Sequence, residues 1–112
     1  MRIEGIIWLE NVECKIWEKH RVQPDEVEAA LGSDPHVRFV ERGFRQGEDV
    51  YSALGRTPDG RYLIVYFVYK PRTREALVVT ARRMTRKERR QHGKAGWQDD
   101  RPQDQPLSVA EL

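Results

Sequence analysis

The sequence predicts an α+β domain in which two N-terminal helices pack on a four-stranded antiparallel sheet, followed by a short basic helix. Apolar residues recur at helical spacing before residue 32, and after residue 35 they recur at every second position, as in a strand. A basic segment with a helix capping signal then follows the last apolar run. We assign residues 1–96 to one domain. We expect a mobile tail over 97–112, where polar residues lack periodicity, with a last helical turn over 108–112.

Two short helices are predicted in the first third of the chain. Residues 6–9 form an apolar lead-in, and Asn11 is a candidate N-cap for a helix over 12–20. A second helix is expected to begin at Pro24, because proline is favoured at the first helical position. It should end at Gly32, which we expect to adopt a left-handed cap. Both helices are short, so each must bury an apolar stripe against a core.

The sheet is predicted from four runs of β-branched, aliphatic and aromatic residues. The third run is apolar on both faces and should therefore be central. If the second and fourth strands flank it in antiparallel order, both run the same way. Arg56 and Arg82, at the ends of these two strands, then reach the same edge of the sheet. The predicted strands cover residues 37–41, 49–56, 62–69 and 76–81.

Charge is distributed unevenly along the chain, although the net charge is only +2. Residues 1–50 carry seven basic and eleven acidic side chains, residues 51–81 carry five and two, and residues 82–112 carry eight and five. Between Arg82 and Arg90 there are six basic residues and one acidic residue. This concentration of positive charge favours an anionic partner such as nucleic acid.

The basic segment contains its own helix signal. Thr85 and Glu88 have the spacing of a capping box, so a helix should begin at Thr85 and end before Gly93. Cys14 is the only cysteine, which excludes an internal disulfide and a Cys-x-x-Cys metal site. The longest apolar run has eight residues, compared with the ~20 that a membrane helix needs. We therefore expect a cytoplasmic protein with no membrane segment, metal or other cofactor.

Several segments of the chain resemble the BrnT family of type II toxin–antitoxin toxins, which are ribonucleases of the RelE-like superfold. The most specific is an apolar strand that ends in Ala-Arg-Arg and is followed by a Thr-x-x-Glu-Arg helix, at Val79–Arg89. The other matching residues are Trp8, Lys19-His20, Asp25–Leu31, Tyr51–Thr57 and Gly60–Val65. Together these segments span about residues 6 to 92, nearly all of the predicted fold.

The resemblance implies a small toxin that cleaves RNA and halts translation. It also implies a tightly bound BrnA-like antitoxin with a ribbon-helix-helix domain, through which the complex would contact DNA indirectly. One position departs from the family pattern. Many members carry tyrosine four residues after the glutamate, where this chain has His92. An imidazole can serve as proton donor where a phenol would.

Metal-independent RNA cleavage needs a base for the 2′-hydroxyl, cations for the phosphate and a donor for the departing 5′-oxygen. Arginine suits the phosphate because its planar fork meets two oxygens at once. Histidine suits proton transfer because its ordinary pKa is near ~6.5. We assign Arg56, Arg82 and Arg83 to the phosphate, His20 or Glu88 as base, His92 or Lys19 as donor, and Arg86, Lys87, Arg89 and Arg90 to further RNA contacts.

Other interpretations of these residues remain open. Glu88 is already explained as a capping residue, and His20 as a cation at the end of a helix. The protein could be a non-catalytic module that binds nucleic acid through residues 82–90, or a structural partner whose basic edge receives an acidic segment. We assign no function to His36, which follows Pro35 in a predicted loop.

Overall fold

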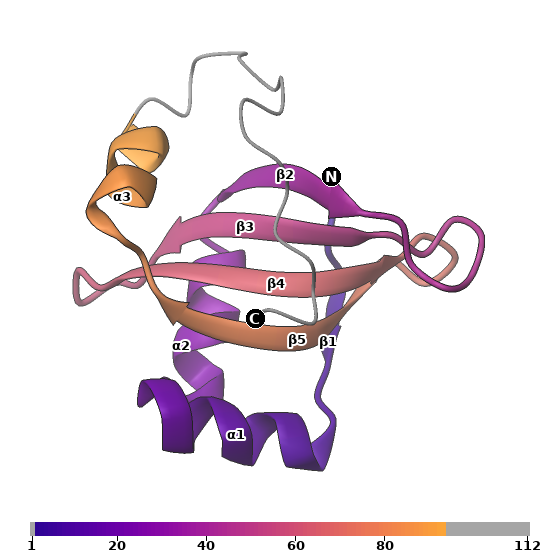
Figure 1. Ribbon diagram of the computed structural model, residues 1–112, viewed down its shortest axis with the longest axis horizontal. Helices are drawn as coiled ribbons and strands as arrows, with labels where there is room; N and C mark the ends of the chain where they lie inside the picture. Colours follow the sequence, from indigo (N-terminus) through magenta and orange to yellow (C-terminus); the bar gives the residue numbers. More distant parts are fainter. Residues whose placement is uncertain (1, 94–112) are drawn as a thin grey trace.

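The computed structural model describes residues 2–93, which form a five-stranded sheet with two helices on one face and a third helix at one end (Figure 1). The predicted α+β class is confirmed. The predicted tail over 97–112 and its last turn at 108–112 lie outside the described residues. In chain order the elements are β1 (Gly5–Ile7), α1 (Glu10–His20), α2 (Pro24–Leu31), β2 (His36–Glu41), β3 (Val50–Arg56), β4 (Tyr62–Lys70), β5 (Glu75–Arg83) and α3 (Arg86–Gly93).

The strands lie in the order β1-β5-β4-β3-β2. The four predicted strands correspond to β2 to β5, and they pair in antiparallel order as expected. The predicted number of strands was wrong, because β1 adds a fifth strand that pairs in parallel with β5, with Gly5 opposite Glu75. A three-residue strand shows no alternation that a sequence pattern could detect, and its partner lies far along the chain.

The first helix begins earlier than predicted. Leu9 is its N-cap and makes no side-chain cap, so Asn11 lies inside the helix instead of capping it. The Leu9 carbonyl accepts hydrogen bonds from the backbone N–H groups of Val12 and Glu13. After the helix, Arg21 adopts a left-handed conformation with φ 54°. Its backbone N–H bonds to the Trp17 carbonyl.

The second helix begins at Pro24, as predicted. Gln23 and Glu26 form a capping box that the sequence analysis missed. The expected left-handed cap at Gly32 was wrong, because Gly32 has a right-handed φ of −83°. Its N–H continues the helical pattern by bonding to the Glu28 carbonyl. The helix therefore ends without a change of handedness.

The central strand β4 is buried on both faces, as its apolar run predicted. Leu63, Val65 and Phe67 belong to the core under α1 and α2, and alternate residues face the other side. Helix α2 lies directly against β3, since a Cβ added at Gly55 would lie 2.4 Å from the Ala30 carbonyl oxygen. The second core cluster contains Val40, Val50, Leu54, Ile64, Tyr66 and Met84.

Candidate active site

The sheet topology brings Arg56 and Arg82 to the same end of the sheet. Both β3 and β5 run antiparallel to β4, and they end near α3 (Figure 1). Arg56 lies opposite Tyr62, and Arg82 lies opposite Ile64. Because directly opposed residues share a face and alternate residues of a strand do too, both arginines lie on the side opposite α1 and α2. We call this side of the sheet the arginine face.

The third predicted phosphate ligand, Arg83, does not lie on the arginine face. It is opposite Leu63, whose side chain belongs to the core under the helices. Arg83 is exposed. Strand alternation therefore separates Arg83 from its neighbour Arg82, although both stand at the same end of the sheet.

Arg82 and Glu88 form a two-pronged ion pair between β5 and α3. The Arg82 Nη1 and Nη2 atoms donate to the Glu88 carboxylate over 2.8 and 2.9 Å. Nη2 also lies 3.5 Å from the hydroxyl oxygen of Tyr66. The Glu88 carboxylate accepts the Thr85 backbone N–H over 2.8 Å, and the Thr85 hydroxyl accepts the Glu88 N–H over 3.2 Å. The predicted capping box is confirmed, and its carboxylate also holds an arginine.

The protonation states follow from this network. Burial raises the pKa of Glu88, but the hydrogen bonds and charge of Arg82 and the Thr85 backbone N–H outweigh burial and leave the pKa below its ordinary value. The hydrogen bond to Glu88 raises the pKa of Arg82. Burial raises the pKa of Tyr66, so its phenol keeps its proton at neutral pH. Glu88 is therefore an anion whose oxygens are already engaged, which suits it to orient Arg82.

Tyr62 connects the cations of β3 and α3. The Arg56 guanidinium carbon lies 5.4 Å from the centre of the Tyr62 ring, and that of Arg89 lies 4.6 Å from it. Contacts of this kind are attractive because the ring face carries negative charge. The ring thus gathers one arginine from the sheet and one from the helix. The sequence analysis missed Tyr62, because alternation groups it with Ile64 and Tyr66 but only the register of β3 with β4 places it opposite Arg56.

His20 is the last residue of α1 and is partly buried. Burial lowers the pKa of its imidazole below the ordinary 6.5, and the charges of Arg82 and Lys19 lower it further. The imidazole is therefore mainly neutral at neutral pH, which is the form that accepts a proton. His20 belongs to α1, which packs on the side of the sheet away from the arginine face, and the charge of Arg82 still contributes to the lowering of its pKa. Lys19 is exposed beside it.

The other predicted residues lie on α3. Arg86, Lys87, Arg89 and Arg90 are exposed along this helix, and the Arg89 guanidinium lies over the Tyr62 ring. His92 belongs to the helix backbone, and its side chain lies outside the part of the chain that the structure describes.

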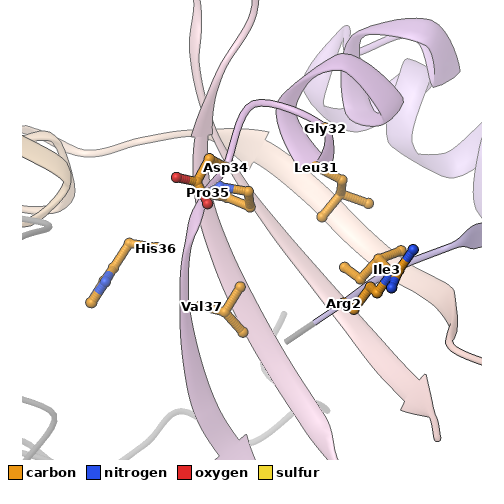
Figure 2. Close-up of a pocket in the computed structure, with 8 residues that line it drawn as sticks. All are labelled: Arg2, Ile3, Leu31, Gly32, Asp34, Pro35, His36 and Val37. Carbon is orange, nitrogen blue, oxygen red and sulfur yellow. The ribbon is translucent and has the colours of Figure 1, made fainter.

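A cavity of about 620 Å³ lies elsewhere, between the N-terminal segment, the end of α2 and the start of β2 (Figure 2). Ile3, Leu31 and Val37 line it. Val37 lies opposite Ala53, which belongs to the core under the helices. The cavity is therefore on the helix side of the sheet, and the described residues that line it include none of the predicted catalytic side chains.

Comparison with protein-family models matches residues 8–88 to the ribonuclease toxin BrnT of type II toxin–antitoxin systems. The match covers more than half of the chain. The chain belongs to the BrnT family of ribonuclease toxins. Comparison with curated proteins returns no match.

The BrnT match includes most of the predicted site residues. Lys19, His20, Arg56, Arg82 and Glu88 all fall within residues 8–88. Membership of a type II toxin family implies a protein antitoxin as partner. The matched segment ends at Glu88, so the ion pair between Arg82 and Glu88 is inside it, whereas the exposed arginines at 89 and 90 follow it.

Two further findings concern this BrnT family member as far as the structure describes it. Within residues 2–91, whose side chains the structure describes, no three His, Cys, Asp or Glu side chains are grouped so that they could hold a metal ion. Over residues 2–93, each helix is too short or too polar to span a membrane.

Proposed function

We propose that this BrnT family member is a metal-independent endoribonuclease that acts in the cytoplasm and inhibits translation by cleaving RNA. A BrnA-like antitoxin with a ribbon-helix-helix domain would neutralise it and give the complex indirect contact with DNA. The observation that carries the proposal is the position of Arg56 and Arg82 on one face and at one end of the sheet. His20 supplies a mainly neutral imidazole, whose pKa is lowered by burial and by the charges of Arg82 and Lys19.

In the proposed reaction, His20 removes the proton of a 2′-hydroxyl as that oxygen attacks the adjacent phosphorus. The bond from phosphorus to the 5′-oxygen breaks, and Lys19 or His92 supplies a proton to this leaving oxygen. The products are a 2′,3′-cyclic phosphate and a free 5′-hydroxyl. Arg56 and Arg82 stabilise the charge on the phosphate oxygens as it increases, which is the task that a metal ion performs in other nucleases.

The hydrogen bonds and lowered pKa of Glu88 support His20 as the base in this proposal. The Glu88 carboxylate accepts two hydrogen bonds from Arg82 and one from the Thr85 backbone, and its pKa is lowered. A carboxylate so engaged accepts a proton poorly at neutral pH. In this proposal Glu88 is a positioning residue that holds the Arg82 guanidinium toward the arginine face.

The test is cleavage of RNA by the purified chain in the presence of a chelator. We expect cleavage to persist, and Arg82→Ala to slow it by about 10²–10³-fold, as for other lost transition-state contacts. His20→Ala should slow it by about 10²-fold or more. Arg74→Ala is a matched control, because Arg74 is an exposed arginine paired with Glu4 next to the turn between β4 and β5. His20→Ala at the wild-type rate would remove the base from the mechanism.

Growth after induction is a simpler measurement. A ribonuclease toxin should arrest growth when expressed without its antitoxin, and Arg82→Ala should restore growth at equal protein level. Normal growth with the wild-type chain would contradict the proposed toxicity.

One observation favours a second function, a non-catalytic module that binds nucleic acid through residues 82–90. Both terminal nitrogens of Arg82 are already paired with Glu88, so this guanidinium has a structural partner without RNA. Such a module would bind RNA with an affinity that falls steeply with salt, and would cleave none in the chelator assay.

A further inference from the structure

The edge strand β2 carries two basic side chains on the arginine face. His36 lies opposite Leu54, and Arg38 lies opposite Ser52. Leu54 belongs to the second core cluster, on the side away from the helices. Figure 2 shows the His36 ring on the other side of β2 from Val37, and His36 is also among the residues that line the mouth of the cavity. His36, which the sequence analysis left without a function, therefore shares a face with the candidate active site.

These two residues continue the line of N–H donors that begins at Arg56. Arg56 lies two residues after Leu54 on β3, so it is a diagonal neighbour of His36, with roughly 7–8 Å between their backbones. Arg38 follows two residues after His36 on the same face, roughly 7 Å farther along β2. Arg56, His36 and Arg38 thus lead from the candidate site to the outer strand of the sheet.

Arg38 lacks a counter-charge that comparable arginines have. Within residues 2–93, three arginines are partly buried, at positions 38, 61 and 82. Arg61 pairs with Glu26, and Arg82 pairs with Glu88. Arg38 has no ion pair or hydrogen bond with another described side chain. Removing a guanidinium from water without a partner costs free energy, so an anionic ligand at this position would be stabilised.

We propose that His36 and Arg38 form a phosphate subsite for the RNA strand, adjacent to the linkage held at Arg56. This inference rests on the proposed ribonuclease function and deepens it by extending the substrate contact across β2. A guanidinium binds phosphate oxygens with two parallel hydrogen bonds, and an imidazole donates an N–H in either charge state. RNA fits a line of donors on one face because it presents an anion at every nucleotide.

The test compares a short and a long RNA that share one scissile site, each made uncleavable by a 2′-deoxy nucleotide at that site. The short RNA ends before it could reach β2, and the long RNA extends past it on both sides. For the long RNA, Arg38→Ala should raise the Kd about tenfold and reduce the slope of log K against log salt by about one. His36→Ala should raise the Kd for the long RNA by a smaller factor. The short RNA should bind all variants equally.

Arg45→Ala is the matched control, because Arg45 is an exposed arginine in the loop between β2 and β3. It removes the same charge and should leave both Kd values unchanged. Circular dichroism should show the same folded spectrum for all variants. With the corresponding cleavable long RNA, Arg38→Ala should raise KM while kcat stays at the wild-type value.

Three results would overturn the subsite. The first is equal Kd values for Arg38→Ala and Arg45→Ala, and the second is equal weakening of the short and long RNA. The third is weaker binding of poly-L-glutamate to Arg38→Ala with unchanged RNA binding, which would assign the surface to an acidic protein segment. Failure of the ribonuclease proposal gives a different pattern, in which the wild-type chain cleaves no RNA.

Discussion

Substitutions at Glu88 and Thr85 separate the ion pair with Arg82 from the capping box of α3. The carboxylate pairs with Arg82, and it accepts the Thr85 backbone N–H in the capping box of α3. Glu88→Gln keeps an oxygen that can accept this N–H but removes the negative charge. Thr85→Ala removes the hydroxyl that caps the Glu88 N–H and leaves the ion pair intact. Glu88→Ala removes both the charge that pairs with Arg82 and the oxygen that accepts the Thr85 N–H.

The magnitudes follow from burial. The Arg82 and Glu88 side chains are 25% and 17% exposed. Exposed ion pairs contribute about 0–1 kcal/mol, whereas breaking a buried pair costs about 3–5 kcal/mol. We therefore expect Glu88→Gln to lower the free energy of unfolding by about 2 kcal/mol. Loss of a helix cap costs about 1 kcal/mol, so Thr85→Ala should cost about 1 and Glu88→Ala about 3 kcal/mol.

Urea unfolding of the three variants at neutral and acidic pH measures these differences. The pKa of Glu88 lies below its ordinary 4.5 in the folded state. The stability due to its charge is therefore fully present above pH 4.5 and is lost as the pH falls through the lower folded value. The difference in free energy of unfolding between wild type and Glu88→Gln should disappear at acidic pH. A difference under about 0.5 kcal/mol at pH 7, or one that persists in acid, would refute the reasoning.

Three further predictions concern packing, pH dependence and RNA affinity. Gly55→Ala should lower the free energy of unfolding by about 1–3 kcal/mol in urea, because the new Cβ would lie 2.4 Å from the Ala30 carbonyl oxygen and displace α2. Cleavage should slow as the pH falls through the His20 pKa, which lies below 6.5. In a profile of cleavage rate against pH, Lys19→Gln should move the midpoint of this acidic fall upward toward 6.5, because the Lys19 charge lowers the pKa of His20. Arg89→Ala should reduce the salt slope of RNA binding by about one.

Each of these predictions has a control or a contradicting result. Gly32→Ala should cost less than Gly55→Ala, since a Cβ at Gly32 would lie 3.3 Å from its nearest neighbouring atom. If the cleavage rate of Lys19→Gln falls at the same pH as that of the wild type, the His20 pKa does not determine this fall. Arg72→Ala removes an exposed arginine from the turn between β4 and β5, so it should leave the salt slope unchanged. Equal slopes in all variants would place RNA away from α3.

The sequence by itself determined the local elements and much of their order. The continuous apolar run identified β4 as central, because a strand buried on both faces carries apolar residues at successive positions instead of alternating with polar ones. The spacing of Thr85 and Glu88 gave the start of α3 to within one residue. The antiparallel order of β3, β4 and β5 then brought Arg56 and Arg82 to one end of the sheet.

Only the tertiary structure decided which of these residues meet. The register placed Arg82 on the arginine face and Arg83 on the other, and it joined Glu88 to Arg82. It also placed His36 diagonally across from Arg56, twenty residues later in the chain, and paired β1 with β5. Capping and periodicity depend on near neighbours, so a sequence displays them directly. Register depends on contacts between distant segments, and a shift of one residue would turn each side chain to the opposite face.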